Sequence, residues 1–256
     1  MGKLDGKVIL VTGGARGQGE AHARLYVQEG ARVVVGDVLD AEGQAVAVSL
    51  GEQALYVHQD VSEQEGWDRL ISEAKRRFGR IDGLVNNAGI IAYHSILDMP
   101  LAQYRKIVAV NQIGTFLGVQ AAAKAMIEAG HGGSIVNIGS GAGLQGYALC
   151  TGYVDSKFAV RGLTRTAAIE LGRYGIRVNA IHPGFINTQM GVSAGDNEQD
   201  FSQYYEAIPI GRIGEPSEIA RLGLFLLSED SSFCTGSEFL ADGGELAGDS
   251  SLLKAD

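Results

Sequence analysis

Cysteine, proline and long apolar runs are scarce in this sequence, and each shortage excludes a class of protein. The two cysteines, Cys150 and Cys234, are far apart along the chain, so we expect no disulfide framework and no metal site. No apolar run approaches the about 20 residues that span a bilayer, which predicts a cytoplasmic protein with no membrane partner. With 4 prolines against 37 glycines, the glycines are expected in tight turns between regular elements.

Basic residues are also outnumbered, with 21 Lys and Arg against 30 Asp and Glu, for a net charge of -9. Binding to nucleic acid or to an anionic membrane requires clustered Lys and Arg, so neither is an expected partner. The 256 residues are 45% hydrophobic, which is enough for one substantial core. We therefore expect residues 1–256 to form a single α/β domain.

Short β-branched runs alternate with longer amphipathic stretches along most of the chain, which is typical of strand-helix units and a parallel sheet. The predicted strands are Lys7–Thr12, Arg32–Asp37, Ala54–Gln59, Gly83–Asn86, Gly133–Ile138, Arg177–His182 and Glu238–Ala241. The predicted helices are Gln18–Glu29, Ala41–Leu50, Glu63–Phe78, Leu101–Glu128, Gly152–Tyr174 and Pro216–Leu227. These elements predict a doubly wound seven-stranded parallel sheet flanked by helices.

A glycine-rich turn follows the first predicted strand and leads into the first predicted helix. It reads Thr12-Gly13-Gly14-Ala15-Arg16-Gly17-Gln18-Gly19. Glycines let the backbone approach a pyrophosphate, and a helix amino terminus offers free N–H groups and the positive end of its dipole. Many such turns merely join a strand to a helix, so the prediction depends on the order of strand, turn and helix.

Asp37 ends the second predicted strand, about 20 residues after the turn, where a carboxylate can accept hydrogen bonds from both adenosine ribose hydroxyls. A turn or helix-initiating carboxylate is the alternative. Unit charges about 4 Å apart repel by about 4 kcal/mol at an effective dielectric near 20, so Asp37 disfavours a 2′-phosphate and predicts NAD rather than NADP. Arg16 is the opposing signal, because a basic residue in the glycine turn can pair with that phosphate.

Tyr153 and Lys157 are four residues apart at the start of a predicted helix, which places both side chains on one face. Lowering a tyrosine pKa from near 10 to about 7 requires roughly 4 kcal/mol, which Lys157 and a positively charged nicotinamide can supply. Ser140 ends the fifth predicted strand, at the edge where doubly wound folds bind ligands. Asn111 provides an amide that can anchor a water for proton delivery to Lys157.

Each of these four residues also has an ordinary structural explanation. Tyr153 and Lys157 fit an exposed helix face, and Ser140 fits a turn. Asn111 fits a capping or core amide. Their occurrence as an ordered set after a glycine turn makes a catalytic group the better interpretation.

Together, the motifs resemble the short-chain dehydrogenase/reductase family over essentially the whole chain. The matching residues are Thr12-Gly-x-x-x-Gly17-x-Gly19, Asp60-Val61, Asn86-Asn87-Ala88-Gly89, Asn111, Ser140, Tyr153-x-x-x-Lys157, Pro183-Gly184 and Thr188. The resemblance implies a Rossmann fold and a catalytic set of Asn111, Ser140, Tyr153 and Lys157. It also implies a cofactor site formed by Gly13, Arg16, Gly17, Gln18, Gly19, Asp37, Val38, Asp60, Val61, Asn87, Ala88, Gly89, Tyr153, Lys157, Pro183, Gly184, Ile186 and Thr188.

Within that site, the resemblance implies that Asp60 and Val61 contact the adenine and that Ile181–Thr188 holds the carboxamide end of the nicotinamide. Two positions depart from the family pattern. Asp155 stands where alanine is most common inside the tyrosine motif, and Gly139 stands where a second serine often precedes the catalytic one. Neither departure removes a reacting group, and Asp155 is expected to point elsewhere on the helix.

Three segments, Ile90–Ser95, Ala142–Leu149 and Phe185–Ile210, are expected to line a substrate pocket with few fixed charges. Their bulky members, each of which also fits simple packing, are Ile91, Tyr93, Leu144, Tyr147, Leu149, Phe185, Met190, Phe201, Tyr204 and Tyr205. A polar stretch after the Pro-Gly turn predicts a mobile lid over about residues 185–212. The tail, about residues 245–256, is expected to be either loosely ordered or packed on a neighbouring subunit.

The expected reaction is reversible hydride transfer between NAD and a secondary alcohol or ketone, with Tyr153 as general acid and base. The glycine turn, Asp37–Asp40 and Asp242-Gly-Gly are similar to those of bacterial 3α(or 20β)-hydroxysteroid dehydrogenases, which implies an apolar substrate such as a hydroxysteroid. The family resemblance also implies a homotetramer. The alternatives are a 3-oxoacyl thioester (acyl-carrier-protein) reductase, a small-alcohol or polyol dehydrogenase, and a dinucleotide-sensing scaffold without turnover.

Overall fold

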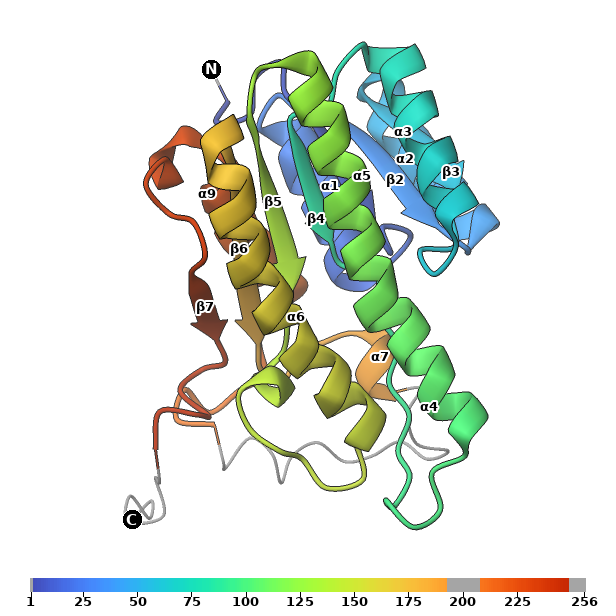
Figure 1. The fold of residues 1–256 in the computed structure, drawn as a ribbon, viewed down its shortest axis with the longest axis vertical. Coiled ribbons are helices and arrows are strands. Elements are labelled where there is room, and N and C mark those ends of the chain that lie inside the picture. Colours follow the sequence, from blue (N-terminus) through green and yellow to red (C-terminus); the bar gives the residue numbers. More distant parts are fainter. Residues whose placement is uncertain (1, 193–207, 249–256) are drawn as a thin grey trace.

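Seven parallel strands form one sheet in the computed structural model, which describes residues 2–192 and 208–248 (Figure 1). The strands are β1 Val8–Thr12, β2 Arg32–Asp37, β3 Ala54–His58, β4 Gly83–Asn86, β5 Gly133–Ile138, β6 Ile176–Pro183 and β7 Glu238–Ala241. Their order is β3-β2-β1-β4-β5-β6-β7, and every neighbouring pair is parallel. The predicted doubly wound sheet is confirmed, and each predicted strand agrees within about one residue at either end.

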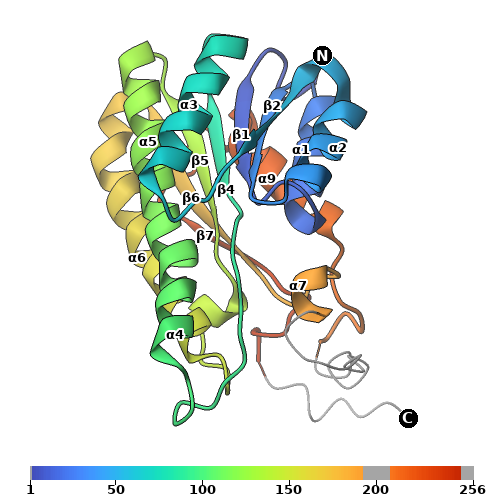
Figure 2. The ribbon, with the colours of Figure 1, turned by 90° about the vertical axis from the view of Figure 1, so that its right-hand side faces the viewer.

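Helices cover both faces of the sheet (Figure 2). One layer contains α1 Gly17–Gln28, α2 Asp40–Leu50 and α9 Pro216–Leu227, and the other contains α3 Gln64–Phe78, α5 Gly114–Ala129 and α6 Thr151–Leu171. Two shorter helices, α4 Leu101–Val108 and α7 Gln189–Val192, lie beyond the carboxyl ends of the strands. Within the described ranges, no helix is both long and apolar enough to cross a membrane.

Alternate residues of β1 face opposite helical layers, which explains why this strand is apolar at each position from Val8 to Val11. In β1, Val8 and Leu10 pack in the core beside α3, α5 and α6, whereas Ile9 and Val11 pack in the core beside α1 and α9. All four side chains are fully buried. Burial of apolar surface on both faces stabilises the sheet as a platform for the residues at its ends.

The order of strands reverses between β1 and β4. β1 pairs with β2 on one side and with β4 on the other, so the helices that follow β1 and β4 lie on opposite faces. Doubly wound sheets bind ligands at the carboxyl ends of the strands that flank such a reversal. The loops after β4, β5, β6 and β7 gather beyond the arrowheads in Figure 1. We call this side of the molecule the carboxyl edge, and the opposite side the amino edge.

The predicted range Leu101–Glu128 is helical throughout, but a wide π-helical turn over Ala109–Ile113, which was not predicted, separates α4 from α5. The turn contains Asn111, whose side-chain amide bonds the backbone of Ile90 in another loop. Helical periodicity carries no information about such a distant contact. The sequence therefore predicts the helix but not the wide turn within it.

Parts of the expected substrate region lie outside the described residues. For the predicted lid, the structure describes 185–192 and 208–212, and Phe201, Tyr204 and Tyr205 lie outside these ranges. For the predicted tail, it describes 245–248. The functions assigned to the lid and the tail stay predictions.

Candidate active site

The glycine turn links β1 to α1 at the carboxyl edge. Gly13 and Gly17 have φ angles of 62° and 57°, in the left-handed region that favours glycine. A Cβ atom on Gly13 would lie 2.8 Å from the Cα of Ala88, so the turn also packs directly against the loop after β4. Arg16 precedes α1 and its side chain forms no capping hydrogen bond within the described structure, which leaves first-turn N–H groups available to an anion.

Residues that follow β6 lie across the glycine turn. A Cβ on Gly17 would be 3.4 Å from Cγ2 of Thr188, and Nη1 of Arg16 donates to Oε1 of Gln189 at 2.7 Å. Oε1 of Gln18 is buried in the first turn of α1 and has no hydrogen-bond partner among the described residues. A buried unpaired acceptor beside uncapped N–H groups fits a ligand with both phosphate and donor groups, as a dinucleotide has.

Asp37 ends β2 at the same edge and is 9% exposed. Its Oδ2 accepts a hydrogen bond from the backbone of Ala15 at 3.0 Å, and its Oδ1 accepts one from the backbone of Leu39 at 3.1 Å. Each carboxylate oxygen has two lone pairs, so both retain capacity for a ribose hydroxyl. The neighbouring Val38 side chain is half exposed.

The Asn86–Gly89 segment holds the carboxyl ends of β1 and β4 together. Asn87 donates from Nδ2 to the backbone oxygens of Thr12 and Gly13, both at 3.0 Å. The Thr12 hydroxyl accepts from the backbone N–H groups of Asn87 and Ala88, both at 3.1 Å. These two predicted cofactor residues therefore also build the scaffold that supports the glycine turn.

Asp60 and Val61 follow β3 at this edge. Oδ1 of Asp60 accepts from the backbone N–H of Ser62 at 2.9 Å and from its hydroxyl at 2.7 Å, which forms the turn into α3. The Val61 side chain is buried in the core, and its backbone oxygen accepts from Nε1 of Trp67 at 2.9 Å. Their contacts with an adenine stay a prediction.

The residues predicted to hold the nicotinamide end continue from β6. The backbone N–H of Gly184 donates to the oxygen of Ala241 at 3.1 Å, which fixes the segment against the end of β7. Ile186 forms a bridge with Gly214, and Pro183 is the last residue of β6. This segment therefore runs from the sheet toward the glycine turn.

Tyr153 and Ser140 come together at the carboxyl edge from α6 and from the loop after β5. The Ser140 side chain lies close enough to the Tyr153 hydroxyl to influence its pKa. Oγ of Ser140 also accepts from the backbone of Ala142 at 3.1 Å, at the start of a 3₁₀ turn over Gly141–Gly143. Burial raises the pKa of Tyr153 to about 12, and the Ser140 side chain acts in the opposite direction. Without further positive charge, the phenol stays protonated at neutral pH.

Lys157 lies one helical turn after Tyr153 and is 4% exposed. Its Nζ is 5.5 Å from the centroid of the Tyr153 ring and donates to the backbone oxygen of Ile138 at 2.8 Å. Burial lowers the pKa of Lys157 to about 8. The ammonium is therefore still charged at neutral pH, beside the phenol that it is predicted to activate.

Asn111 holds the loop after β4 against this pair. Its Oδ1 accepts from the backbone N–H of Ile90 at 2.8 Å, and its Nδ2 donates to the oxygen of Ile90 at 2.9 Å and to the Ser156 hydroxyl at 3.1 Å. A Cβ on Gly89 would lie 3.5 Å from Oδ1 of Asn111 and 3.8 Å from Nζ of Lys157. The structure thus brings the four predicted catalytic side chains to one place, and the anchored water stays a prediction.

The described members of the predicted substrate pocket all lie beyond the carboxyl edge, in loops or in α7, and are half-buried or exposed. They are Ile91, Tyr93, Leu144, Tyr147, Leu149, Phe185 and Met190. Leu149 has a φ of 65°, the one positive value at a non-glycine residue in the described ranges. Its backbone oxygen accepts from the N–H of His94 at 2.8 Å, which ties the loop after β4 to the start of α6.

Sequence reasoning misses Glu245 in this region. Its Oε1 accepts from the Tyr147 hydroxyl at 2.7 Å, and burial raises the pKa of Glu245. The turn after β7 brings it there, because the Asp242 carboxylate accepts from the backbone N–H groups of Gly244 at 2.9 Å and Leu246 at 2.8 Å. The Asp-Gly-Gly sequence indicates a tight turn after the last strand, and such a turn could have predicted that the chain after β7 folds back toward the site.

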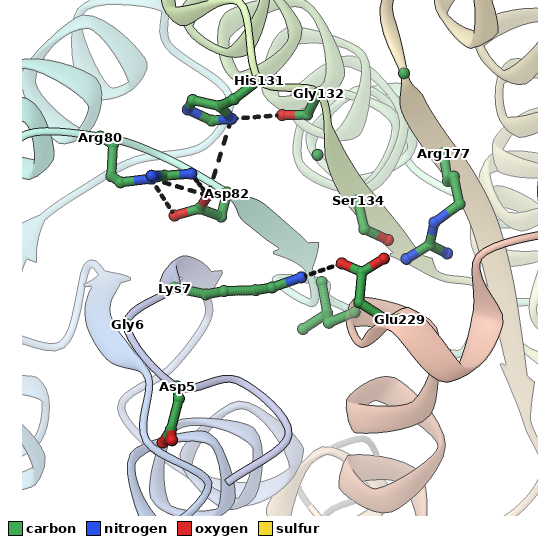
Figure 3. A pocket seen from close by; sticks show the side chains of 13 residues that line it. Asp5, Gly6, Lys7, Arg80, Asp82, His131, Gly132, Ser134, Arg177 and Glu229 are labelled. Carbon is green, nitrogen blue, oxygen red and sulfur yellow. Dashed lines mark hydrogen bonds and ion pairs between the residues drawn. The ribbon is translucent and has the colours of Figure 1, made fainter. Parts of the chain in front are cut away.

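A separate hollow of about 560 Å³ lies at the amino edge (Figure 3). Four of its charged side chains form two pairs, Lys7 with Glu229 at 2.6 Å and Arg80 with Asp82. Arg177 donates to backbone and hydroxyl oxygens in the segment after α9. Because this hollow lies at the opposite edge from the predicted catalytic residues, we place the candidate active site at the carboxyl edge.

Comparison with known proteins identifies the family of this chain. A crystal structure of a short-chain type dehydrogenase/reductase from Mycobacterium marinum is 35% identical and has a TM-score of 0.89, over 96% of this chain and 97% of that chain. The model of a family described as enoyl-(acyl carrier protein) reductase matches residues 13–245. This chain belongs to the short-chain dehydrogenase/reductase family.

Two relatives within the short-chain dehydrogenase/reductase family match almost the whole chain. The 3-alpha-(or 20-beta)-hydroxysteroid dehydrogenase of Mycobacterium tuberculosis is 49% identical, over 96% of this chain and 92% of its own length. The trans-4-hydroxycyclohexanecarboxylate dehydrogenase of Sinomonas cyclohexanicum is 43% identical, over 94% of this chain and 93% of its own length. The resemblance drawn from the motifs is confirmed.

Both departures from the short-chain dehydrogenase/reductase pattern leave the reacting groups in place. As expected, Asp155 points elsewhere on α6, where it accepts from the exposed Tyr104 hydroxyl at 3.1 Å. A Cβ on Gly139 would lie 2.5 Å from Nδ1 of His182, a buried residue of β6. Sequence patterns do not identify His182, because one histidine within an apolar strand has no characteristic spacing.

Proposed function

We propose that this short-chain dehydrogenase/reductase interconverts a secondary alcohol and a ketone with NAD, and that Tyr153 is its general acid and base. One observation supports the proposal above all others. The Ser140 side chain acts to lower the pKa of the Tyr153 phenol, and the buried ammonium of Lys157 lies 5.5 Å from the centroid of the phenol ring. This is the arrangement that proton transfer to and from a carbinol oxygen needs.

The carboxyl edge fits NAD. The N–H groups of α1 would hold the pyrophosphate, Asp37 the adenosine ribose and Lys157 the nicotinamide ribose. The buried, unpaired Oε1 of Gln18, which lacks a partner among the residues described, supports this fit because a bound ligand would satisfy it. When bound, NAD supplies the hydride acceptor and a positive charge near the phenol.

Ser140 and Tyr153 would both contact the substrate oxygen. The Ser140 hydroxyl orients that oxygen, and Tyr153 takes the alcohol proton in oxidation and returns it in reduction. Lowering the Tyr153 pKa from about 12 to near 7 requires roughly 7 kcal/mol. Unit charges about 5 Å apart attract by about 3 kcal/mol at an effective dielectric near 20, which is the order of what the charge of Lys157 can contribute. Lys157 alone is therefore insufficient, and we expect the phenolate to form mainly in the complex with the oxidised cofactor.

Asp37 favours NAD over NADP in this proposal. A 2′-phosphate about 4 Å from the carboxylate would be repelled by about 4 kcal/mol at an effective dielectric near 20. Arg16, the opposing signal, donates to Gln189 across the glycine turn instead of standing beside Asp37.

The substrate that we propose is an apolar cyclic alcohol or ketone such as a hydroxysteroid. The bulky pocket residues are apolar or aromatic, and relatives with high identity act on a hydroxysteroid and on a substituted cyclohexanol. The test is NADH formation with purified protein and a panel of 3- and 20-hydroxysteroids, cyclohexanol and sorbitol. We expect the steroids and cyclohexanol to be oxidised. Oxidation of sorbitol alone would indicate a polyol dehydrogenase, and no turnover of any alcohol would leave a dinucleotide-sensing scaffold.

A second candidate is reduction of an acyl thioester. The description of the matching family model favours it, and the same four side chains would serve that reaction. An acidic acyl carrier needs a basic docking surface, whereas this chain has a net charge of -9. Turnover of an acetoacetyl thioester with NADPH at a higher kcat/KM than any alcohol with NAD would establish this candidate instead.

We also propose that the chain forms a homotetramer in the cytoplasm. Large apolar side chains are exposed on α5 at Phe116, on α6 at Phe158 and Ile169, and near β7 at Phe233 and Leu240. Contact between copies would remove these surfaces from water. Sedimentation equilibrium should give four times the mass of the chain, and a stable monomer at micromolar concentration would contradict the proposal.

A further inference from the structure

His182 lies directly beneath the catalytic serine, although the proposed reaction assigns it no function. It is fully buried near the end of β6, and its Nδ1 is 2.9 Å from the backbone oxygen of Ser140. The same oxygen accepts from the N–H of Gly143 at 2.8 Å, so both of its lone pairs are used. The ring therefore contributes one of two bonds that fix the main chain of Ser140.

The tautomer of this ring follows from its surroundings. Burial lowers the pKa of His182, so the ring is neutral and carries one N–H. Nε2 is buried and has no hydrogen-bond partner in the part of the chain that is described. A proton on Nε2 would let Nδ1 accept from the backbone N–H of Ser140 at 3.4 Å, but it would leave the Nε2–H unsatisfied and a lone pair of Nδ1 facing the Ser140 oxygen at 2.9 Å. The proton therefore belongs on Nδ1, which donates to Ser140.

The backbone just before Ser140 leaves space for the ring. A Cβ on Gly139 would lie 2.5 Å from Nδ1 and 2.6 Å from Cε1 of His182. Any larger residue at 139 would have to displace the imidazole, which gives a physical reason for the glycine at that position.

The charged groups around the ring come from α6 and β7. Glu238 acts to raise the pKa of His182, and Arg161 and Lys157 act to lower it. Arg161 is itself bound to Glu238 at 3.0 Å and donates to the backbone oxygen of Gly143 at 3.0 Å. The ring thus lies in a packed environment that keeps it in one orientation.

We propose that His182 is a positioning residue, whose Nδ1–H holds the main chain of Ser140 so that the serine hydroxyl faces Tyr153. In this proposal, position 139 is glycine because any side chain there would occupy the space of the imidazole ring. The inference rests on the proposed function, because it gives Ser140 its place in the reaction. A displacement of about 1 Å in a catalytic group can cost about 100-fold in rate, so loss of this bond should act on kcat.

The first test compares two substitutions at 182 with the alcohol that the wild type oxidises best. Asparagine can place an amide N–H near the position of Nδ1, whereas leucine fills similar space without a donor. We expect His182→Leu to lower kcat by about 10- to 100-fold with KM nearly unchanged, and His182→Asn to retain kcat within about 5-fold. Equal losses in both variants, wild-type kcat in His182→Leu, or a loss confined to KM would overturn the proposal.

His22 offers a matched control for simple loss of a buried histidine. It is also fully buried, its Nδ1 lies 2.6 Å from the Tyr26 hydroxyl, and its Nε2 likewise has no partner among the described residues. We expect His22→Leu to lower the melting temperature without changing kcat. If His22→Leu lowered kcat as much as His182→Leu, the effect would be one of packing and the proposal would fail.

A double-mutant cycle tests the link with Gly139. Gly139→Ser should lower kcat because the new side chain displaces the ring, and the same change in the His182→Leu background should add little further loss. Fully additive losses would separate the two residues and overturn that part of the proposal.

Nitrogen NMR of imidazole-labelled protein gives a readout that does not depend on turnover. The resonances of His182 are those that disappear in His182→Asn, and we expect Nδ1 to be protonated and Nε2 unprotonated. A protonated Nε2 would contradict the placement of the ring. If no alcohol is turned over while NMR shows the expected tautomer, the proposed function fails and the geometry stands, so the two failures are distinguishable.

Discussion

The two edges of the sheet differ in how many of their polar groups have hydrogen-bond or ion-pair partners within the protein. At the amino edge, Asp82 accepts from the backbone N–H of Val8 at 2.9 Å and from Arg80, so its carboxylate is fully engaged. At the carboxyl edge, Oε1 of Gln18 has no partner in the described ranges, and the buried ammonium of Lys157 bonds a backbone oxygen. The same sheet thus has one edge with paired charges and another with polar groups available to a ligand.

The difference indicates where stability and activity are encoded. Paired groups at the amino edge stabilise the fold, whereas unpaired groups at the carboxyl edge cost stability and gain partners when a ligand binds. Substitutions at the amino edge should therefore change the free energy of unfolding, and substitutions at the carboxyl edge should change turnover.

The largest effect is expected from Tyr153→Phe, which removes the reacting hydroxyl and keeps the ring. We expect kcat to fall by about 10²- to 10⁴-fold with little change in melting temperature, measured by NADH formation. Tyr104→Phe is the matched control, because the Tyr104 hydroxyl bonds the exposed Asp155. Near-normal turnover in Tyr153→Phe would remove the catalytic assignment.

Asp37→Asn should change cofactor preference at the carboxyl edge. Removing the negative charge relieves a repulsion of up to about 4 kcal/mol on a 2′-phosphate, so the ratio of kcat/KM with NAD to that with NADP should fall by up to about 10³-fold. Initial rates measured over a concentration series of each cofactor, at one fixed alcohol concentration, give this ratio. An unchanged ratio would show that Asp37 does not select the cofactor.

Asp82→Ala should act on stability at the amino edge. Val8 is fully buried, so its N–H would lose its acceptor, and we expect the free energy of unfolding in urea to fall by about 1–3 kcal/mol with kcat/KM unchanged. Glu229→Gln is the control in the same hollow. Its side chain is 82% exposed, so loss of its pair with Lys7 should cost less than about 1 kcal/mol. Lost turnover in folded Asp82→Ala would break the division between the edges.

The pH dependence of stability should reveal the buried ammonium of Lys157. Its pKa is about 8 in the folded chain against 10.5 ordinarily, so the unfolded chain binds more protons between these values. Lys157 should therefore make the ligand-free protein more stable as pH rises from 8 to 10, by up to about 1.4 kcal/mol per pH unit. Above pH 10 the raised pKa of Tyr153 opposes this trend.

Urea unfolding of the wild type and of Lys157→Met at pH 8, 9 and 10 isolates that contribution. The stability of the variant should rise less steeply with pH than that of the wild type. Identical slopes would show that Lys157 is not held in a desolvated environment.

The fold was largely predictable because apolar strands and amphipathic helices are local patterns, and the ends of β2, β4, β5 and β7 agree with them. The catalytic set was predictable as an ordered group of residue types. Three features were not predictable: the π-helical turn at Ala109–Ile113, the position of Glu245 beside Tyr147, and the burial of His182 beneath Ser140. Each depends on a hydrogen bond to a segment distant in sequence, which neither spacing nor composition records.

The π-helical turn over Ala109–Ile113 also bears on how this protein tolerates changes of length. Such a turn accommodates an extra residue while the helix on either side keeps its facing. A one-residue deletion inside it can convert the π turn to an ordinary α-helical turn, which would change the direction of the Asn111 side chain. A one-residue deletion early in α5 has no such outlet and would rotate Ala122 and Met126 by about 100°, away from the sheet that they cover. Insertions and deletions are therefore expected to accumulate at the turn and to be excluded from the helix that follows it.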